Sequence, residues 1–114
     1  LFQGYSVVSG SDPKRNISWY MNDKTRVMRK IQIDQDFIVL LETDPGLLLN
    51  ENIFRIRFDG DIVWQISVTR YIYDESPYVE VNLNGDILWA FNSDSSRVDI
   101  DVESGRILRK VHVR

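Results

Sequence analysis

Apolar and polar side chains alternate with a two-residue period along most of the chain, and this pattern predicts an all-β protein. The alternating segments are rich in β-branched and aromatic residues, and Gly, Pro, Asn, Asp and Ser separate them. We expect about eight strands, at residues 28–33, 36–42, 53–58, 61–69, 78–83, 86–92, 97–102 and 106–113. Because they follow one another through mostly short turns, the pattern indicates an antiparallel meander and not a βαβ fold.

The length of 114 residues suggests one domain, which we place at residues 27–114. Residues 1–4, LFQG, look like the remnant of a viral 3C protease site, and we exclude them from the fold. Residues 5–26 are polar and form an N-terminal extension, either partly disordered or a short appended element; Met21 is a candidate native start. Residues 47–50 fit either a strand or one helical turn.

One phrase occurs twice: residues 59–66 read DGDIVWQI and residues 84–91 read NGDILWAF. In the first copy, we expect a three-residue loop at 58–60 with Gly60 in the left-handed conformation. This loop places Arg57 opposite Asp61, and one face of the two strands then carries only apolar side chains. That face comprises Phe54, Ile56, Ile62 and Trp64. The same loop in the second copy gathers Val79, Val81, Ile87 and Trp89. We therefore expect both tryptophans in the core, as part of the fold and not of a ligand site.

A third hairpin turns at Ser104-Gly105. Its apolar residues match across the turn only with an even-length loop, which would put Glu103 opposite Arg106. The three hairpins resemble blades of a β-propeller, particularly the quinoprotein type, over residues 53–67 and 78–91 and more weakly over 97–109. Eight strands make about two blades. The resemblance therefore implies an open half-propeller-like meander or a twisted sandwich.

The net charge of −3 conceals a strong segregation of charge. Residues 31–105 hold fifteen Asp/Glu and four Arg, a balance of −11, whereas residues 106–114 hold four Lys/Arg and no acid. Phosphate contacts need clustered Lys and Arg, so we expect neither nucleic acid nor an anionic membrane as a direct partner of the acidic middle. Such a surface would attract a basic protein, although acidic charge is also an ordinary property of a solvated surface.

Signatures of catalysis are missing from the sequence. There is no cysteine, and His112 is the single histidine, in a basic C-terminal segment that favours a surface role. Aspartate pairs spaced by two residues occur at 34/36, 59/61 and 99/101, but turn chemistry and strand surfaces explain them. We expect no enzyme activity, no metal and no cofactor.

The segment YIYDESPY, at residues 71–78, combines three tyrosines with two acids around a proline. Tyrosine offers a large amphipathic contact area, and neighbouring acids suit a basic partner. The competing interpretation is a long connection whose tyrosines cover the edge of the core.

Three stretches, at residues 52–66, 76–94 and 98–108, make this chain resemble the immunity proteins of bacterial polymorphic toxin systems, such as contact-dependent growth inhibition. The resemblance implies a cytoplasmic inhibitor that blocks the active site of one cognate toxin, often a basic nuclease. The predicted partner contacts are the acidic and tyrosine side chains of the connections, namely Tyr73, Asp74, Glu75, Tyr78, Glu42, Asp44, Asp94 and Asp99. The alternative is a carbohydrate- or peptide-binding β module that uses Trp64, Trp89 or the tyrosines.

Overall fold

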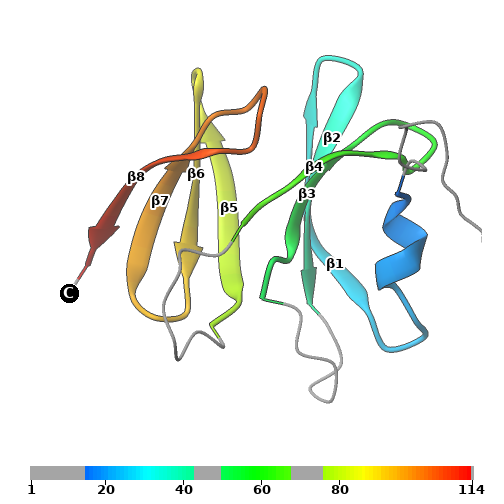
Figure 1. The fold of residues 1–114 in the computed structure, drawn as a ribbon, viewed down its shortest axis with the longest axis horizontal. Coiled ribbons are helices and arrows are strands. Elements are labelled where there is room, and N and C mark those ends of the chain that lie inside the picture. The colour runs from blue at the N-terminus through cyan, green and yellow to red at the C-terminus, as the bar shows by residue number, and fades with distance from the viewer. Residues whose placement is uncertain (1–14, 43–49, 68–75, 114) are drawn as a thin grey trace, which may run out of the picture.

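The structure is a computed structural model that describes residues 15–42, 50–67 and 76–113. In these residues eight antiparallel strands form two four-stranded sheets, each with its strands in chain order (Figure 1). The first sheet contains β1 (Arg26–Ile33), β2 (Asp36–Glu42), β3 (Ile53–Ile56) and β4 (Ile62–Gln65). The second contains β5 (Tyr78–Asn84), β6 (Ile87–Asn92), β7 (Ser96–Ile100) and β8 (Ile107–His112). The predicted all-β meander of about eight strands is confirmed.

The main core lies between the two sheets, which face each other in Figure 1. Alternation along each strand turns one set of side chains toward the opposite sheet, where burial removes apolar surface from water. The first sheet contributes Ile38, Leu40, Ile53 and Trp64, with Ile66 just beyond β4, and the second contributes Tyr78, Val81, Leu88, Ala90, Val98 and Ile100. The arrangement is an open pair of sheets.

A buried asparagine joins the two sheets. The Nδ2 of Asn52 donates to the carbonyl oxygens of Leu41 at 2.9 Å and Tyr78 at 2.8 Å, and its Oδ1 accepts from the Tyr78 amide at 2.9 Å. All these groups lie in the interior, where an unpaired polar atom would cost free energy. Asn52 therefore fixes the start of β5 against the end of β2.

Residues 15–25 form an appended element that covers the outer face of the first sheet. The 3-10 helix η1 (Ile17–Tyr20) sets Ile17 and Tyr20 against the apolar cluster of Val39, Leu41 and Phe54. The Ile17 amide donates to the Gly60 carbonyl at 2.8 Å, which ties this element to the β3–β4 turn. Of the two interpretations of residues 5–26, the appended element holds for 15–25, and residues 5–14 lie outside the described part.

In the first copy of the repeat, the predicted loop is correct but the predicted face is only partly so. Gly60 is left-handed, with φ 91°, and Ile56 pairs with Ile62. A β-bulge then pairs Trp64 with Arg55, so Trp64 turns into the core between the sheets while Phe54 faces η1. The prediction that Phe54 and Trp64 share a face is wrong, because one extra residue reverses the alternation.

In the second copy, the predicted three-residue loop is wrong. Asn84 pairs with Ile87 across a two-residue turn, and Leu83 pairs with Leu88. Trp89 therefore points to the outer face, and Ile87 is 53% exposed. Because residues 87–91 are all apolar, the alternating pattern does not show which face of this strand is buried. In the structure, Leu88 and the small Ala90 fill the space between the sheets.

The prediction that Val79 is buried is also wrong, because the start of β5 is irregular. A bulge between Tyr78 and Glu80 turns Val79 outward, where it is 44% exposed, and leaves Val81 buried. Of the four residues expected on one buried face, only Val81 is in the core.

The third hairpin has the predicted even-length loop but a longer one than expected. Ile100 pairs with Ile107, and the Asp101 amide donates to the Arg106 carbonyl at 2.9 Å, so four residues, 102–105, form the loop. Asp101, and not Glu103, thus stands opposite Arg106. The Asp101 carboxylate accepts from the Ser104 hydroxyl at 2.8 Å, which stabilises the wider turn.

Candidate partner-binding surfaces

Two turns from different sheets meet at one end of the molecule through a buried arginine. The Nε of Arg55 donates to Asp36 Oδ2 at 2.9 Å, and Nη1 donates to the Val102 carbonyl at 2.9 Å. Asp34 and Glu103 lie farther from the guanidinium, at 4.0 and 3.9 Å. Arg55 thereby gathers carboxylates from the β1–β2 turn and the β7–β8 loop. We call Asp34, Asp36, Asp101 and Glu103 the acidic rim.

The side chain of Arg55 is 8% exposed, whereas those of Asp34 and Glu103 are 79% and 77% exposed. A buried charge needs paired partners, and Asp36 with the Val102 carbonyl supplies them. The two exposed carboxylates are screened by water at the longer distances, so most of their negative charge faces solvent.

Asp101 keeps its negative charge to unusually low pH. Hydrogen bonds from the Ser104 hydroxyl and then from the Glu103 amide lower its pKa below the ordinary value of 3.8, with a further contribution from the charge of Arg106. These bonds also shape the loop, since each fixes one residue of the turn. Asp101 therefore stays ionised across the physiological range of pH.

The β7–β8 loop is held in place by Trp64 of the first sheet. The indole Nε1 donates to the Val102 carbonyl at 2.8 Å. Gly105 packs directly on the ring: its φ is 77°, and a Cβ there would lie 2.4 Å from Trp64 Cδ2. Only glycine fits this contact, so the repeated tryptophan of the first copy positions part of the acidic rim.

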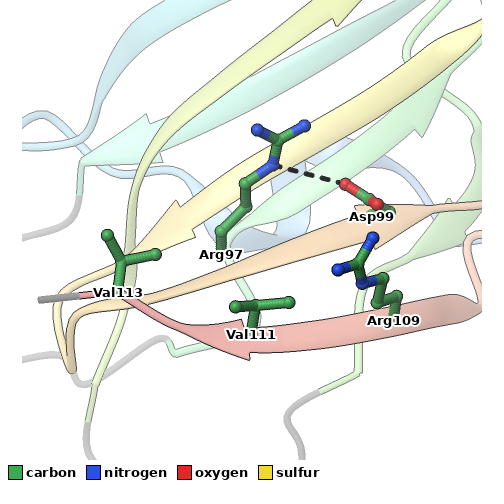
Figure 2. A pocket seen from close by; sticks show the side chains of 5 residues that line it. All are labelled: Arg97, Asp99, Arg109, Val111 and Val113. Atoms are coloured by element: carbon green, nitrogen blue, oxygen red, sulfur yellow. Dashed lines mark ion pairs between the residues drawn. The ribbon is translucent and has the colours of Figure 1, made fainter.

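The outer face of the second sheet carries a different set of side chains. The Arg97 guanidinium lies 4.8 Å from the centre of the Trp89 ring, in a cation–π arrangement, and its Nε lies 3.4 Å from Asp99 Oδ1. A hollow of about 300 Å³ lies beside Arg97 and Asp99. It is lined by Arg97, Asp99, Arg109, Val111 and Val113 (Figure 2). No described element covers this face, in contrast to the first sheet.

The four predicted contact residues that the structure describes do not gather at one place. Four of the predicted contacts lie outside the described residues, namely Tyr73, Asp74, Glu75 and Asp44. Residues 47–49, predicted as a strand or one helical turn, also lie outside them. Tyr78 is a correction: at 3% exposure it belongs to the core between the sheets and offers no surface to a partner. Tyr78 does not belong to the acidic connection, because β5 begins at this residue.

The other three predicted contacts are described and separate. Glu42 forms an exposed ion pair with Arg26 at the end of β2. Asp94 lies in the β6–β7 turn, where its Oδ1 accepts from the Ser96 amide at 2.9 Å and its Oδ2 lies 3.4 Å from Lys110 Nζ. Asp99 is on the outer face of the second sheet, and its Oδ1 has no hydrogen-bond partner in the described part of the chain.

Burial alone would raise the pKa of Asp94. The hydrogen bonds from Ser96 and the charge of Lys110 outweigh this effect, so the pKa lies below 3.8. The carboxylate is thus occupied by its own turn, which favours a structural role for Asp94.

Sequence reasoning missed the acidic rim. The two-residue spacing of Asp34 and Asp36 is explained equally well by ordinary strand and turn chemistry, and the predicted register only places Glu103 opposite Arg106. A usable signal is Arg55, one of two arginines that alternate with apolar residues at 53–58, because an arginine that faces inward needs carboxylate partners.

No three His, Cys, Asp or Glu side chains in residues 15–42, 50–67 and 76–113 are grouped so as to hold a metal ion. The described part of the chain contains no helix long and apolar enough to cross a membrane. His112 is exposed on β8.

A known family model matches most of the chain. Residues 20–112 match the model of a family described as a domain of unknown function (DUF7957). No curated protein sequence matches the chain significantly. The matched segment contains all eight strands of the two sheets, so the family model covers the whole described β domain.

Proposed function

We propose that this chain, which belongs to the DUF7957 family of domains of unknown function, is a non-catalytic protein. It binds a basic protein partner through its acidic turns. Its specific form is the immunity-type inhibitor that the sequence resemblance implies. The partner would then be a basic toxin, such as a nuclease, whose active site the chain blocks in the cytoplasm.

The observation that carries this proposal is the acidic rim. Buried Arg55 holds two turns together from beneath, so that Asp34 and Glu103 are presented from a preorganised support. A toxin that binds nucleic acid carries Lys and Arg for phosphates, and carboxylates of fixed position can pair with those side chains in their place. Preorganisation limits the ordering cost of binding.

The predicted residues Asp74 and Glu75 form a second candidate contact within the same proposal. They lie on the connection between the sheets, outside the described residues. The sugar-binding alternative is weaker: Trp64 is 7% exposed and cannot act as a stacking platform, and Arg97 occupies a face of Trp89.

The test begins with the neighbouring reading frames of the source genome. Each encoded basic C-terminal domain is expressed with the chain, and retention on the immobilised chain and rescue of cell growth are measured. We expect one basic domain to be retained, with an affinity that falls as salt rises. Reversing two rim charges, with Asp34→Lys and Glu103→Lys, should weaken binding by roughly tenfold or more.

The control is Asp23→Lys, a single charge reversal of the same kind on the exposed turn before β1, and it is compared with Asp34→Lys and Glu103→Lys made singly as well as together. It should leave binding within about twofold, because a distant surface charge contributes little. Unchanged binding in the rim variant, together with lost binding in an Asp74→Lys and Glu75→Lys variant, would move the site to the inter-sheet connection. If no basic domain is retained or neutralised, the immunity function is wrong.

A further inference from the structure

The strand β8 is the open edge of the second sheet. It pairs only with β7 among the described strands. The Val113 amide donates to the Ser95 carbonyl at 2.7 Å, and His112 stands opposite Ser96 in the same register. Because hydrogen-bonded and non-hydrogen-bonded pairs alternate in an antiparallel ladder, the amide and carbonyl of His112 point away from β7. The edge therefore offers backbone groups to a further strand.

This edge has the opposite charge from the rest of the domain. Residues 106–114 contain four Lys/Arg and no acid, against a balance of −11 in residues 31–105. Lys110 lies 3.4 Å from Asp94, so part of its charge is matched within the chain. Arg109 is exposed, and no ion pair joins it to another described residue.

Apolar side chains and a hollow accompany the basic edge. Leu108 is 59% exposed, and Val111 and Val113 are each 39% exposed. Arg109 and Val111 of β8, and Val113 just beyond it, project onto the same face as Arg97 and Asp99 of β7 (Figure 2). These five residues line the hollow, whose volume is about 300 Å³. A strand laid beside β8 would place every second side chain next to this hollow.

We propose that the β8 edge binds an extended acidic segment of another protein, which adds a ninth strand to the described meander. Backbone groups of His112 supply hydrogen bonds, Arg109 binds a carboxylate, and an apolar side chain of the segment packs on Val111 and Val113. This mode of recognition combines a free sheet edge with neighbouring side-chain pockets. It is independent of the acidic rim and needs a partner of the opposite charge.

A second copy of the chain is a poorer occupant. Antiparallel pairing of two β8 strands would bring the Arg109 and Lys110 side chains of both copies together, and like charges opposite one another are destabilising. Charges on an edge strand also protect against aggregation, and this protective role alone would predict no binding of acidic strands.

The experiment uses the full chain, labelled with ¹⁵N, and an eight-residue peptide with the sequence Val-Val-Glu-Glu-Val-Val-Glu-Glu. This repeat places valine and glutamate on both faces of a strand. We expect the peptide to shift the amide resonances of residues 108–113 and to bind more weakly as salt rises. The same peptide with Lys in place of Glu should not bind.

Two pairs of variants separate backbone from charge effects. His112→Pro removes the outward amide and should weaken binding at least about tenfold, whereas His112→Ala keeps the amide and should bind as the wild type does. Arg109→Glu should weaken binding similarly, and Arg57→Glu, an equal change on an exposed turn of the first sheet, should not. Amide spectra of each variant establish that the fold is intact.

The proposal is overturned if the acidic peptide does not bind at millimolar concentration, if it shifts other residues, or if His112→Pro binds it normally. Sedimentation of the wild-type chain tests the second copy: a dimer that His112→Pro converts to monomer would also overturn it. A negative result here would leave binding of a basic partner at the acidic rim unaffected.

Discussion

The two sheets carry the same phrase, Gly-Asp-Ile, apolar, Trp, but use its tryptophan in opposite ways. In the first sheet, a bulge turns Trp64 into the core, where it supports Gly105 and the β7–β8 loop. In the second sheet, a two-residue turn sends Trp89 to the outer face beneath Arg97. A difference of one residue in register thus separates a structural side chain from a surface one.

The outer faces differ as well. The N-terminal element sets Ile17 and Tyr20 against Val39, Leu41 and Phe54, so this part of the outer face of the first sheet is buried. The second sheet leaves its outer face and the β8 edge open in the described residues. The first sheet therefore serves as the scaffold, and the second offers the more accessible surface.

The largest expected effect comes from truncating the two tryptophans. Trp64→Ala should destabilise the protein by about 3–5 kcal/mol, because it opens a cavity and removes the bond to Val102. Trp89→Ala should cost only about 1 kcal/mol, mainly the lost contact with Arg97. Urea unfolding monitored by circular dichroism measures both; equal losses would contradict the different placement of the two side chains.

The glycines of the second sheet's turns give the next effect. Gly105→Ala combines a left-handed residue with a clash on Trp64 and should cost about 3 kcal/mol. Gly85→Ala has no atom within 4 Å of the new Cβ, so only the left-handed backbone, with φ 64°, opposes it, at about 1 kcal/mol. If the two variants unfold at the same urea concentration, Gly105 does not pack on Trp64 as described.

The covering element is tested by two neighbouring aromatic residues. The Tyr20 ring lies 5.1 Å from that of Phe54, so Tyr20→Ala should cost about 2 kcal/mol and increase amide exchange in Val39 and Leu41. Trp19 is 61% exposed, so Trp19→Ala serves as the control and should change the free energy of unfolding by no more than about 0.5 kcal/mol. Equal effects would show that η1 does not seal the outer face.

The smallest effect concerns acid stability. The pKa of Asp94 is lowered in the folded protein, so its ionised form stabilises the fold above pH 3.8, and this stabilisation is lost as pH falls through the lower folded value. Asp94→Asn should be less stable at neutral pH by under about 1 kcal/mol, with the difference shrinking below pH 3.8. Asp86→Asn, on an exposed turn, is the control in urea titrations at several pH values; a constant difference for Asp94→Asn would contradict the linkage.

The site was less predictable than the fold. Asp99 was named from its acidic surroundings, but its position beside Arg97 and above the hollow depends on pairing between β6, β7 and β8. The acidic rim joins residues 34 and 103, and no local pattern connects positions so far apart. What joins them is Arg55, which shares the inward face of β3 with Ile53 through regular pairing with β2, and which reaches residue 103 only because one sheet packs against the other.

The sequence by itself determined the number of strands, their order and the positions of most turns, because alternation and turn residues act over a few neighbours. Only the tertiary structure decided which face each strand buries where the apolar run is continuous, as at residues 87–91. There both registers satisfy local preferences, and the volume available between the sheets selects Leu88 and Ala90 over Trp89.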